Sequence, residues 1–123
     1  MVSSVLVSPP NSLIFVSGGA GDFSTFTDQY KGEAVFATTT VIALGTLCEV
    51  DGSTRVTLAK GHVDVGGLSK SFSGRLDGVN GTLVVETSEG DVLLSGDASS
   101  PIVTIEVFSN DPSEPNEILI VYS

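Results

Sequence analysis

"GTLVVETSEGDVLLSGD", residues 81–97, places two short runs rich in valine and leucine on either side of Glu89-Gly90. Short β-branched runs bounded by turn residues are typical of β-strands. Glycine readily adopts the positive backbone angles of a tight hairpin turn, whereas glutamate adopts them poorly. We therefore predict an antiparallel hairpin that pairs Leu83–Thr87 with Asp91–Leu94, within the runs Thr82–Thr87 and Asp91–Ser95.

The same pattern continues in both directions along the chain. Turn residues recur about every ten residues, which favours an all-β sandwich or barrel. A second hairpin is predicted at Asp51-Gly52, joining Leu47–Val50 to Ser53–Leu58. Other strands are expected in the runs Ser3–Val7, Ser12–Val16, Glu33–Val50, Thr54–Lys60, His62–Val65, Ser69–Leu76, Ile102–Phe108 and Glu117–Tyr122. We predict one all-β domain over residues 1–123, either an antiparallel β-sandwich or a small closed β-barrel of about nine or ten short strands.

One segment, Asp22–Gly32, has helical spacing. Its aromatic residues recur at intervals of three and four, so we predict one short helical turn near Phe23–Tyr30. Such an element either plugs the end of a barrel or forms the wall of a ligand pocket. In the second case the ligand-binding residues would be Phe15, Phe23, Phe26, Tyr30 and Phe36.

The charge balance limits the partners. Fifteen acidic residues against five basic ones give a net charge of −10, and the five cations are scattered singly. Nucleic-acid affinity depends on clustered Lys and Arg, so we expect no nucleic-acid binding. No run approaches the roughly 20 apolar residues of a membrane span, and no secretory signal is evident, so we expect no membrane association and a cytoplasmic protein. Charged residues make up only 16% of the chain, which leaves much surface for copies of itself to cover and favours a homo-oligomer.

Three residues are candidates for acid–base chemistry. His62 and Asp64 would share one face of a strand, where the carboxylate could orient the imidazole as a general base. The alternative is a solvent-facing polar pair opposite a buried face formed by Val63 and Val65. Glu86 follows three apolar residues and could point into a barrel, where burial would raise its pKa.

The polar segment Ser109–Glu117 is the best place to look for a metal. We expect no metal and no cofactor, but if calcium binds, its oxygen ligands would come from Asn110, Asp111, Glu114 and Glu117. A solvated loop is the alternative. One histidine and one cysteine cannot form a zinc site on their own.

Two functions fit this sequence. The first is a non-catalytic binding or assembly domain that self-associates through apolar faces and keeps an acidic exterior, and it agrees with the absence of a reactive motif. The second is a small β-barrel that binds an apolar small molecule in its lumen, as a carrier or as a cyclase or isomerase acting by substrate enclosure. We favour the non-enzymatic reading.

Overall fold

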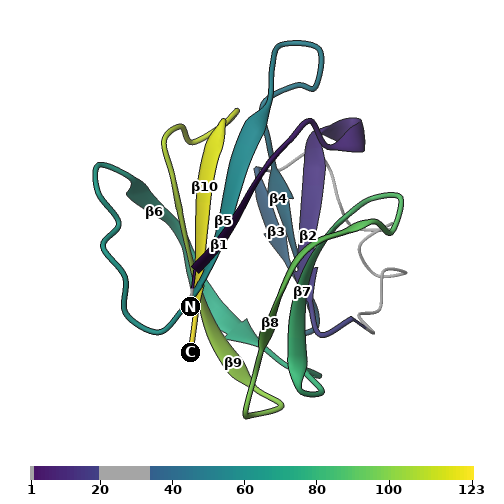
Figure 1. The fold of residues 1–123 in the computed structure, drawn as a ribbon, viewed down its shortest axis with the longest axis vertical. Helices are drawn as coiled ribbons and strands as arrows, with labels where there is room; N and C mark the ends of the chain where they lie inside the picture. Colours follow the sequence, from purple (N-terminus) through teal and green to yellow (C-terminus); the bar gives the residue numbers. More distant parts are fainter. Residues whose placement is uncertain (1, 20–33) are drawn as a thin grey trace.

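Two five-stranded β-sheets face each other in the computed structural model, which describes residues 2–19 and 34–123 (Figure 1). Sheet A has the strand order β1 (Val2–Val7), β5 (Thr54–Lys60), β10 (Glu117–Tyr122), β9 (Val103–Ser109) and β6 (Ser69–Leu76). Sheet B has the order β3 (Val35–Ala37), β4 (Val41–Gly45), β2 (Leu13–Ser17), β7 (Thr82–Thr87) and β8 (Val92–Asp97). The fold is therefore a β-sandwich, and the alternative of a closed barrel is wrong.

The core lies between the sheets. In each strand every second residue faces the other sheet, and in the inner strands most of these positions are apolar and almost fully buried. They include Ile14, Val16, Ile42, Leu44, Val56, Leu58, Leu83, Val85, Ile105, Val107, Ile118 and Ile120. At one end of the sandwich the buried Tyr122 of β10 donates a hydrogen bond from its hydroxyl to the carbonyl of Asp97 in β8, at 2.9 Å. This bond connects the two sheets.

The hairpin predicted from residues 81–97 is confirmed. β7 and β8 pair from Thr82↔Asp97 to Glu86↔Val92, with a bulge after Val85. Gly90 occupies the turn with a φ of 87° and donates its N–H to the carbonyl of Thr87 at 3.0 Å. The glycine thus supplies the left-handed conformation that the turn requires.

The hairpin predicted at Asp51-Gly52 is wrong. β4 ends at Gly45 in sheet B, and residues 46–53 cross to sheet A, where β5 begins at Thr54. Leu47 does not extend a strand but donates its N–H to the carbonyl of Pro115, at 2.8 Å. Half-buried Cys48 begins the turn that Asp51 closes.

Strand pairing is antiparallel as predicted, with one exception among the described strands. β10 runs parallel to β5, in a register that places Glu117 beside Arg55 and Tyr122 beside Lys60. The predicted strand His62–Val65 is not a strand; it belongs to the connection between β5 and β6. The predicted run Glu33–Val50 divides into β3 and β4.

The helical turn predicted near Phe23–Tyr30 lies outside the described residues. Within them, a short 3-10 turn, η1 (Pro10–Ser12), joins β1 to β2. No helix in the described part of the chain has the length and apolar character needed to cross a bilayer.

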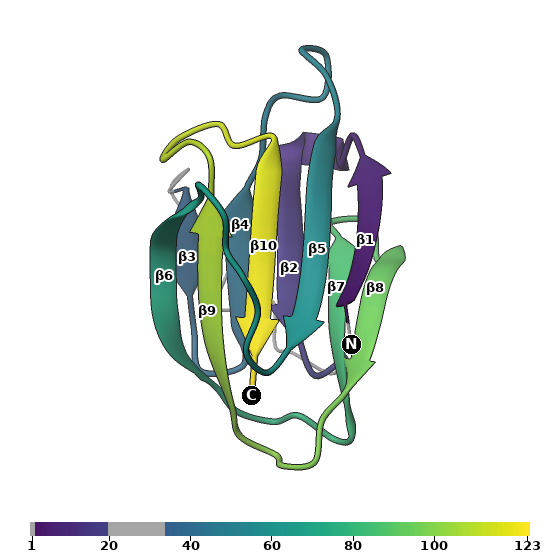
Figure 2. The ribbon, with the colours of Figure 1, turned by 60° about the vertical axis from the view of Figure 1, so that its left-hand side comes forward.

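Residues 61–68 form the feature that shapes the outer surface of sheet A. This segment, here called the strap, leaves the end of β5 and runs back across β10 and β9 to the start of β6 (Figure 2). It therefore covers part of the sheet face that points away from sheet B.

Candidate functional site

The strap is attached to sheet A through apolar side chains. Val63, Val65 and Leu68 are half-buried and pack against Ala59, Leu119 and Val121 on the outer face of the sheet, with Phe108 beside them. These contacts bury a second, smaller apolar cluster outside the main core. They hold the strap along β10 and define one wall of a groove.

Hydrogen bonds set the path of the strap at both ends. Gly61 donates its N–H to the carbonyl of Tyr122 at 2.8 Å, and Leu68 donates to the carbonyl of Val65 at 3.2 Å. Near the middle, Gly66 has a φ of 60° and donates its N–H to Oδ1 of Asp64, at 2.9 Å. The Asp64 carboxylate thus fixes a local turn that a non-glycine residue at 66 would strain.

A groove of about 600 Å³ lies between the strap and the β1–β5 side of sheet A. Its floor contains Val2, Thr57 and Leu119, and residues 63–68 of the strap form the opposite wall. Asn110 and Glu117 close one end. The groove is open along its length, so it fits an extended segment better than an enclosed small molecule.

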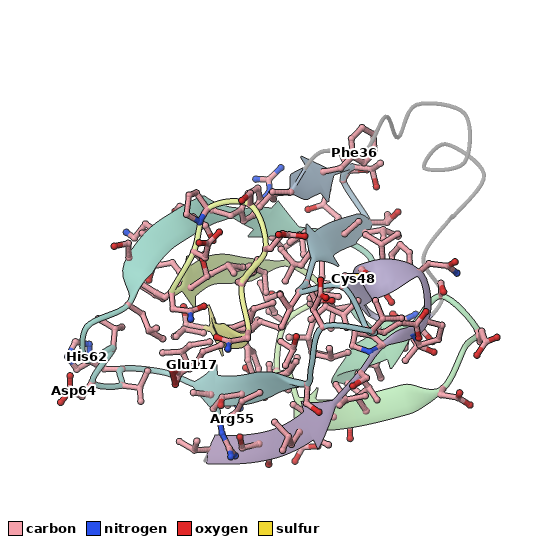
Figure 3. All side chains as sticks on the ribbon, turned by 90° about the horizontal axis from the view of Figure 1, so that it is seen from above. Phe36, Cys48, Arg55, His62, Asp64 and Glu117 are labelled. Carbon is pink, nitrogen blue, oxygen red and sulfur yellow. The ribbon has the colours of Figure 1, made fainter. Side chains whose placement is uncertain are left out.

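The polar groups of the groove are mainly hydrogen-bond acceptors. Asp64 and Glu117 are both exposed and approach the groove from different elements (Figure 3). The residues that line it include no lysine, arginine or histidine, although Arg55 of β5 pairs with Glu117 just outside the lining. Two carboxylates above an apolar floor can accept hydrogen bonds from a lysine or arginine whose aliphatic stem lies against Leu119 and Val2.

The structure unites residues that the sequence placed in separate candidate sites. Asp64 was a candidate acid–base partner of His62, whereas Asn110 and Glu117 were candidate calcium ligands. Asp64, Asn110 and Glu117 all line one groove, and His62 does not. His62 is exposed at the start of the strap (Figure 3). Since Val63 and Val65 are the half-buried residues here, the placement of His62 and Asp64 matches a solvent-facing polar pair.

The loop between β9 and β10 uses its polar side chains to hold its own backbone. Oδ1 of Asp111 accepts hydrogen bonds from the N–H groups of Ser113 and Glu114, both at 2.9 Å, and from the Ser113 hydroxyl at 3.1 Å. The bonds from the backbone of Glu114 and Ser113 lower the pKa of Asp111. Asn110 binds the N–H groups of Asn116 and Glu117, both at 3.1 Å.

These bonds give the side chains of Asn110 and Asp111 a structural role in the loop. Among the residues that the structure describes, no three His, Cys, Asp or Glu side chains gather in a way that could hold a metal ion. Calcium binding by Asn110, Asp111, Glu114 and Glu117 stays a prediction.

Glu86 lies on the outer face of sheet B and does not point into the interior. Leu83 and Val85 belong to the core, and Glu86 alternates with them and pairs with Phe15 of β2. It is half-buried, and burial raises its pKa. A glutamate on an outer face cannot act in a lumen, so the premise for its catalytic role is wrong.

The structure describes two of the five residues of the predicted aromatic ligand pocket, Phe15 and Phe36. Phe15 is buried with Leu13, Val41 and Ala43 on the outer face of sheet B, and Phe36 packs against this cluster. Phe15 and Phe36 each pair with Ala43 of β4, from its two sides, whereas Phe23, Phe26 and Tyr30 lie outside the described residues.

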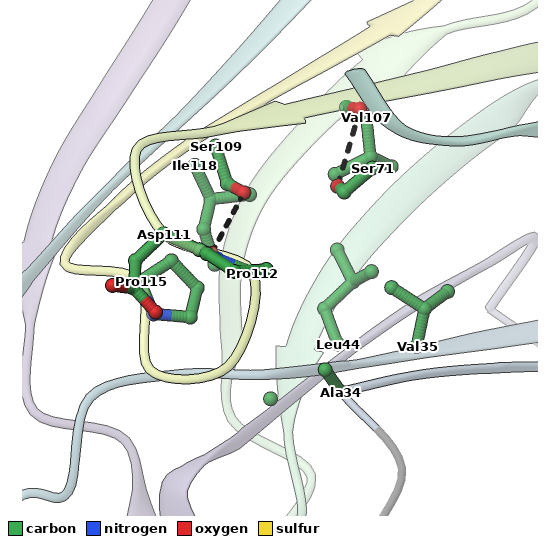
Figure 4. Close-up of a pocket in the computed structure, with 11 residues that line it drawn as sticks. Ala34, Val35, Leu44, Ser71, Val107, Ser109, Asp111, Pro112, Pro115 and Ile118 are labelled. Atoms are coloured by element: carbon green, nitrogen blue, oxygen red, sulfur yellow. Dashed lines mark hydrogen bonds between the residues drawn. The ribbon is translucent and has the colours of Figure 1, made fainter. Parts of the chain in front are cut away.

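One small pocket opens between the sheets, where an interior ligand would lie. The pocket at the β3–β6 side, lined by residues such as Leu44, Val107 and Ile118, holds about 20 Å³, which is about the room that one water molecule needs (Figure 4). Outside it, a cleft of about 460 Å³ runs along Ala34, Val35 and residues 69–71. This cleft is a surface feature of the sandwich edge.

The whole fold is similar to two solved structures that share little sequence with this chain. ComJ from Bacillus subtilis, an inhibitor of the DNA-degrading activity of NucA, has a TM-score of 0.66 and 10% identity, over 99% of this chain and 97% of ComJ. The product of crocagin biosynthetic gene J has a TM-score of 0.58 and 11% identity, over 99% and 96% of the two chains. No family model and no curated protein matches the sequence. The likeness shows the fold.

Sequence reasoning missed the groove because its parts come from distant segments. The signal that was available is the alternation in "HVDV", residues 62–65, which marks Val63 and Val65 as a face that packs on something. It does not say that the surface beneath is the outside of a sheet.

Proposed function

We propose that this chain is a non-catalytic protein-binding module, and that the groove on sheet A receives a cationic segment of a partner protein. The observation that carries the proposal is the groove itself, which has an apolar floor at Val2 and Leu119, carboxylates at Asp64 and Glu117, and no lining cation. An extended peptide with lysine or arginine side chains matches this arrangement in shape and in charge.

The surrounding charge supports the same kind of partner. Two loops next to Glu117, connected by the hydrogen bond from Leu47 to Pro115, carry the exposed carboxylates of Glu49, Asp51, Asp111 and Glu114. With a net charge of −10, the molecule attracts cationic proteins over a distance of about one Debye length, roughly 8–10 Å. We expect faster association at low salt.

The likeness to ComJ supports a nuclease as the partner class. ComJ inhibits the DNA-degrading activity of NucA, and DNA-binding enzymes need a cationic surface because phosphate affinity comes from Lys and Arg. An acidic sandwich that covers such a surface would block DNA without doing chemistry. Binding of an apolar molecule has less support, because the pocket between the sheets is only about 20 Å³.

The test is an inhibition assay in which purified basic endonucleases degrade plasmid DNA at increasing concentrations of this protein. We expect saturable, equimolar inhibition of at least one nuclease. The double variant Asp64→Asn/Glu117→Gln keeps the hydrogen-bond acceptors but removes two charges. If each exposed pair contributes about 0.2–1 kcal/mol, inhibition should weaken by about 2- to 30-fold.

The matched control is Glu89→Gln/Asp91→Asn, which removes the same charge from the exposed β7–β8 turn, outside the groove. It should inhibit almost as well as the wild type. Equal inhibition by the groove variant and the wild type, or inhibition that follows only the net charge of each nuclease, would contradict the proposed site.

A further inference from the structure

β1 presents an unpaired backbone edge. It is the last strand of sheet A, and within residues 2–19 and 34–123 it pairs only with β5, from Val2↔Ala59 to Val7↔Thr54. The N–H and C=O groups on its other side face away from the sheet, and such an edge is a template for another strand.

The other edges of the described sandwich are protected in ways that β1 is not. β6 carries Lys70 and Arg75 and has a bulge after Lys70. β3 has only three residues, and β8 begins after Asp91 and ends at Asp97. Charges, bulges and short length are the devices that block edge-to-edge pairing. β1 is six residues long and contains no charged residue and no proline.

The side chains of β1 also divide between two faces. Val5 and Val7 point inward and pack against the core. Val2 and Leu6 point outward and remain 60% and 59% exposed, with exposed Ser4 between them. An uncharged edge with two exposed apolar side chains is unusual in a chain of net charge −10. An uncharged, partly apolar strand is the neighbour that would cover it without leaving a charge buried.

We propose that this neighbour is β1 of a second copy of the chain. Two β1 strands pair antiparallel about a two-fold axis at Ser4, which joins the two A sheets into one continuous sheet. Ser4 then lies opposite Ser4 of the second copy, and Val2 lies opposite Leu6 of the second copy, twice. Both exposed apolar residues are covered by the same symmetric contact.

The alternation of the strand selects this register. A shift by one residue would place outward residues opposite inward ones. A shift by two residues would place Leu6 opposite Ser4 and leave Val2 opposite Ser8. Only pairing about Ser4 gives both Val2 and Leu6 an apolar partner on the outer face.

Electrostatics permit the contact in spite of the like net charges. Within sheet A, the charged residue that pairs with β1 is Arg55, opposite Leu6. In the proposed register Leu6 lies opposite Val2 of the second copy, and that Val2 pairs in turn with Ala59 of the same copy. This row of paired residues across the joined sheets therefore brings no like charges together. This dimer uses the sheet edge beside the groove, whose lining it touches at Val2, and it goes beyond the function proposed above.

Sedimentation velocity over protein concentrations from about 1 µM to about 1 mM tests the proposal. The mass should rise from 12.6 kDa toward twice that value. Ser4→Lys places two ammonium groups directly opposite each other at the two-fold axis and should weaken the dimer at least tenfold. The matched control is Ser73→Lys, an equally exposed serine on β6 at the opposite edge of sheet A, with the same change in net charge.

A disulfide experiment tests the register and does not depend on the folding of the lysine variant. In a Cys48→Ser background, Ser4→Cys should form a disulfide-linked dimer, since opposite residues in antiparallel strands are about 4.5–5.5 Å apart between Cα atoms. Ser73→Cys should not. A wild type that stays monomeric, equal association by the two lysine variants, or no linked dimer of Ser4→Cys would each overturn the proposal.

Discussion

Removing a single oxygen atom tests how the two sheets are held together. The Tyr122 hydroxyl donates a 2.9 Å hydrogen bond to the Asp97 carbonyl across the sandwich, and the side chain is 1% exposed. Tyr122→Phe keeps the ring and deletes the donor. A partly buried hydrogen bond of this kind contributes about 1–1.5 kcal/mol, because Asp97 is left without its partner.

The expected change in melting temperature follows from the length of the chain. Unfolding entropy of about 2.1 cal/mol/K per residue gives about 0.26 kcal/mol/K for this chain. A loss of about 1–1.5 kcal/mol therefore lowers Tm by about 4–6 °C. Differential scanning calorimetry at pH 7 measures this, and Ser88→Ala, which removes exposed hydrogen bonds to Asn11 and Pro10, should change stability by less than about 0.5 kcal/mol.

The pH dependence of stability tests the same hydrogen bond independently. Burial, and then the charge of Asp97, raise the pKa of Tyr122 above its ordinary value of 10.0. The stabilisation is therefore complete below pH 10.0 and is lost as the pH rises through the folded-state pKa. Wild type and Tyr122→Phe should converge in alkali. A Tm loss below about 1 °C at pH 7 would refute the role of this hydrogen bond.

Three further predictions concern other parts of the molecule. Burial raises the pKa of Glu86, so Glu86→Gln should raise Tm at pH 7, with a gain that shrinks as the pH falls toward 4.5; no gain at pH 7 would count against the burial. Backbone hydrogen bonds lower the pKa of Asp111, so the amide NMR signals of Ser113 and Glu114 should change as the pH falls below 3.8; Asp111→Asn should abolish this change. A Cβ on Gly18 would lie 2.5 Å from the Gly78 carbonyl oxygen, so Gly18→Ala should cost about 1–3 kcal/mol in urea unfolding, whereas Gly67→Ala, with open space around it, should be nearly neutral.

The sequence was most informative where structure is local. The run at residues 81–97 predicted the β7–β8 hairpin because its turn residue and both of its strands are contiguous. The alternation at residues 62–65 predicted which side chains are buried, although the segment is a strap and not a strand. Alternation of apolar and polar residues indicates which side of a segment is covered. It does not distinguish a strand within a sheet from a segment that lies on top of one, because both show the same alternation.

Contacts between segments far apart in the chain could not be predicted from the sequence. Asp51-Gly52 resembles a hairpin turn, but Leu47 bonds to Pro115 and β5 joins the other sheet. The parallel pairing of β5 with β10 joins segments some sixty residues apart in the chain, and no local pattern encodes it. For the same reason Asp64 and Glu117 could be recognised singly, but not as two sides of one groove.

The most direct test of the central claim is an NMR titration of the isotope-labelled protein with a defined peptide that alternates lysine and leucine. We predict saturable shifts in the amides of Gly66, Gly67, Asn110 and Leu119, which line the groove, and much weaker shifts in Asp64→Asn/Glu117→Gln. Shifts spread over all acidic loops without saturation, or confined to the β7–β8 turn, would contradict the groove as the binding site.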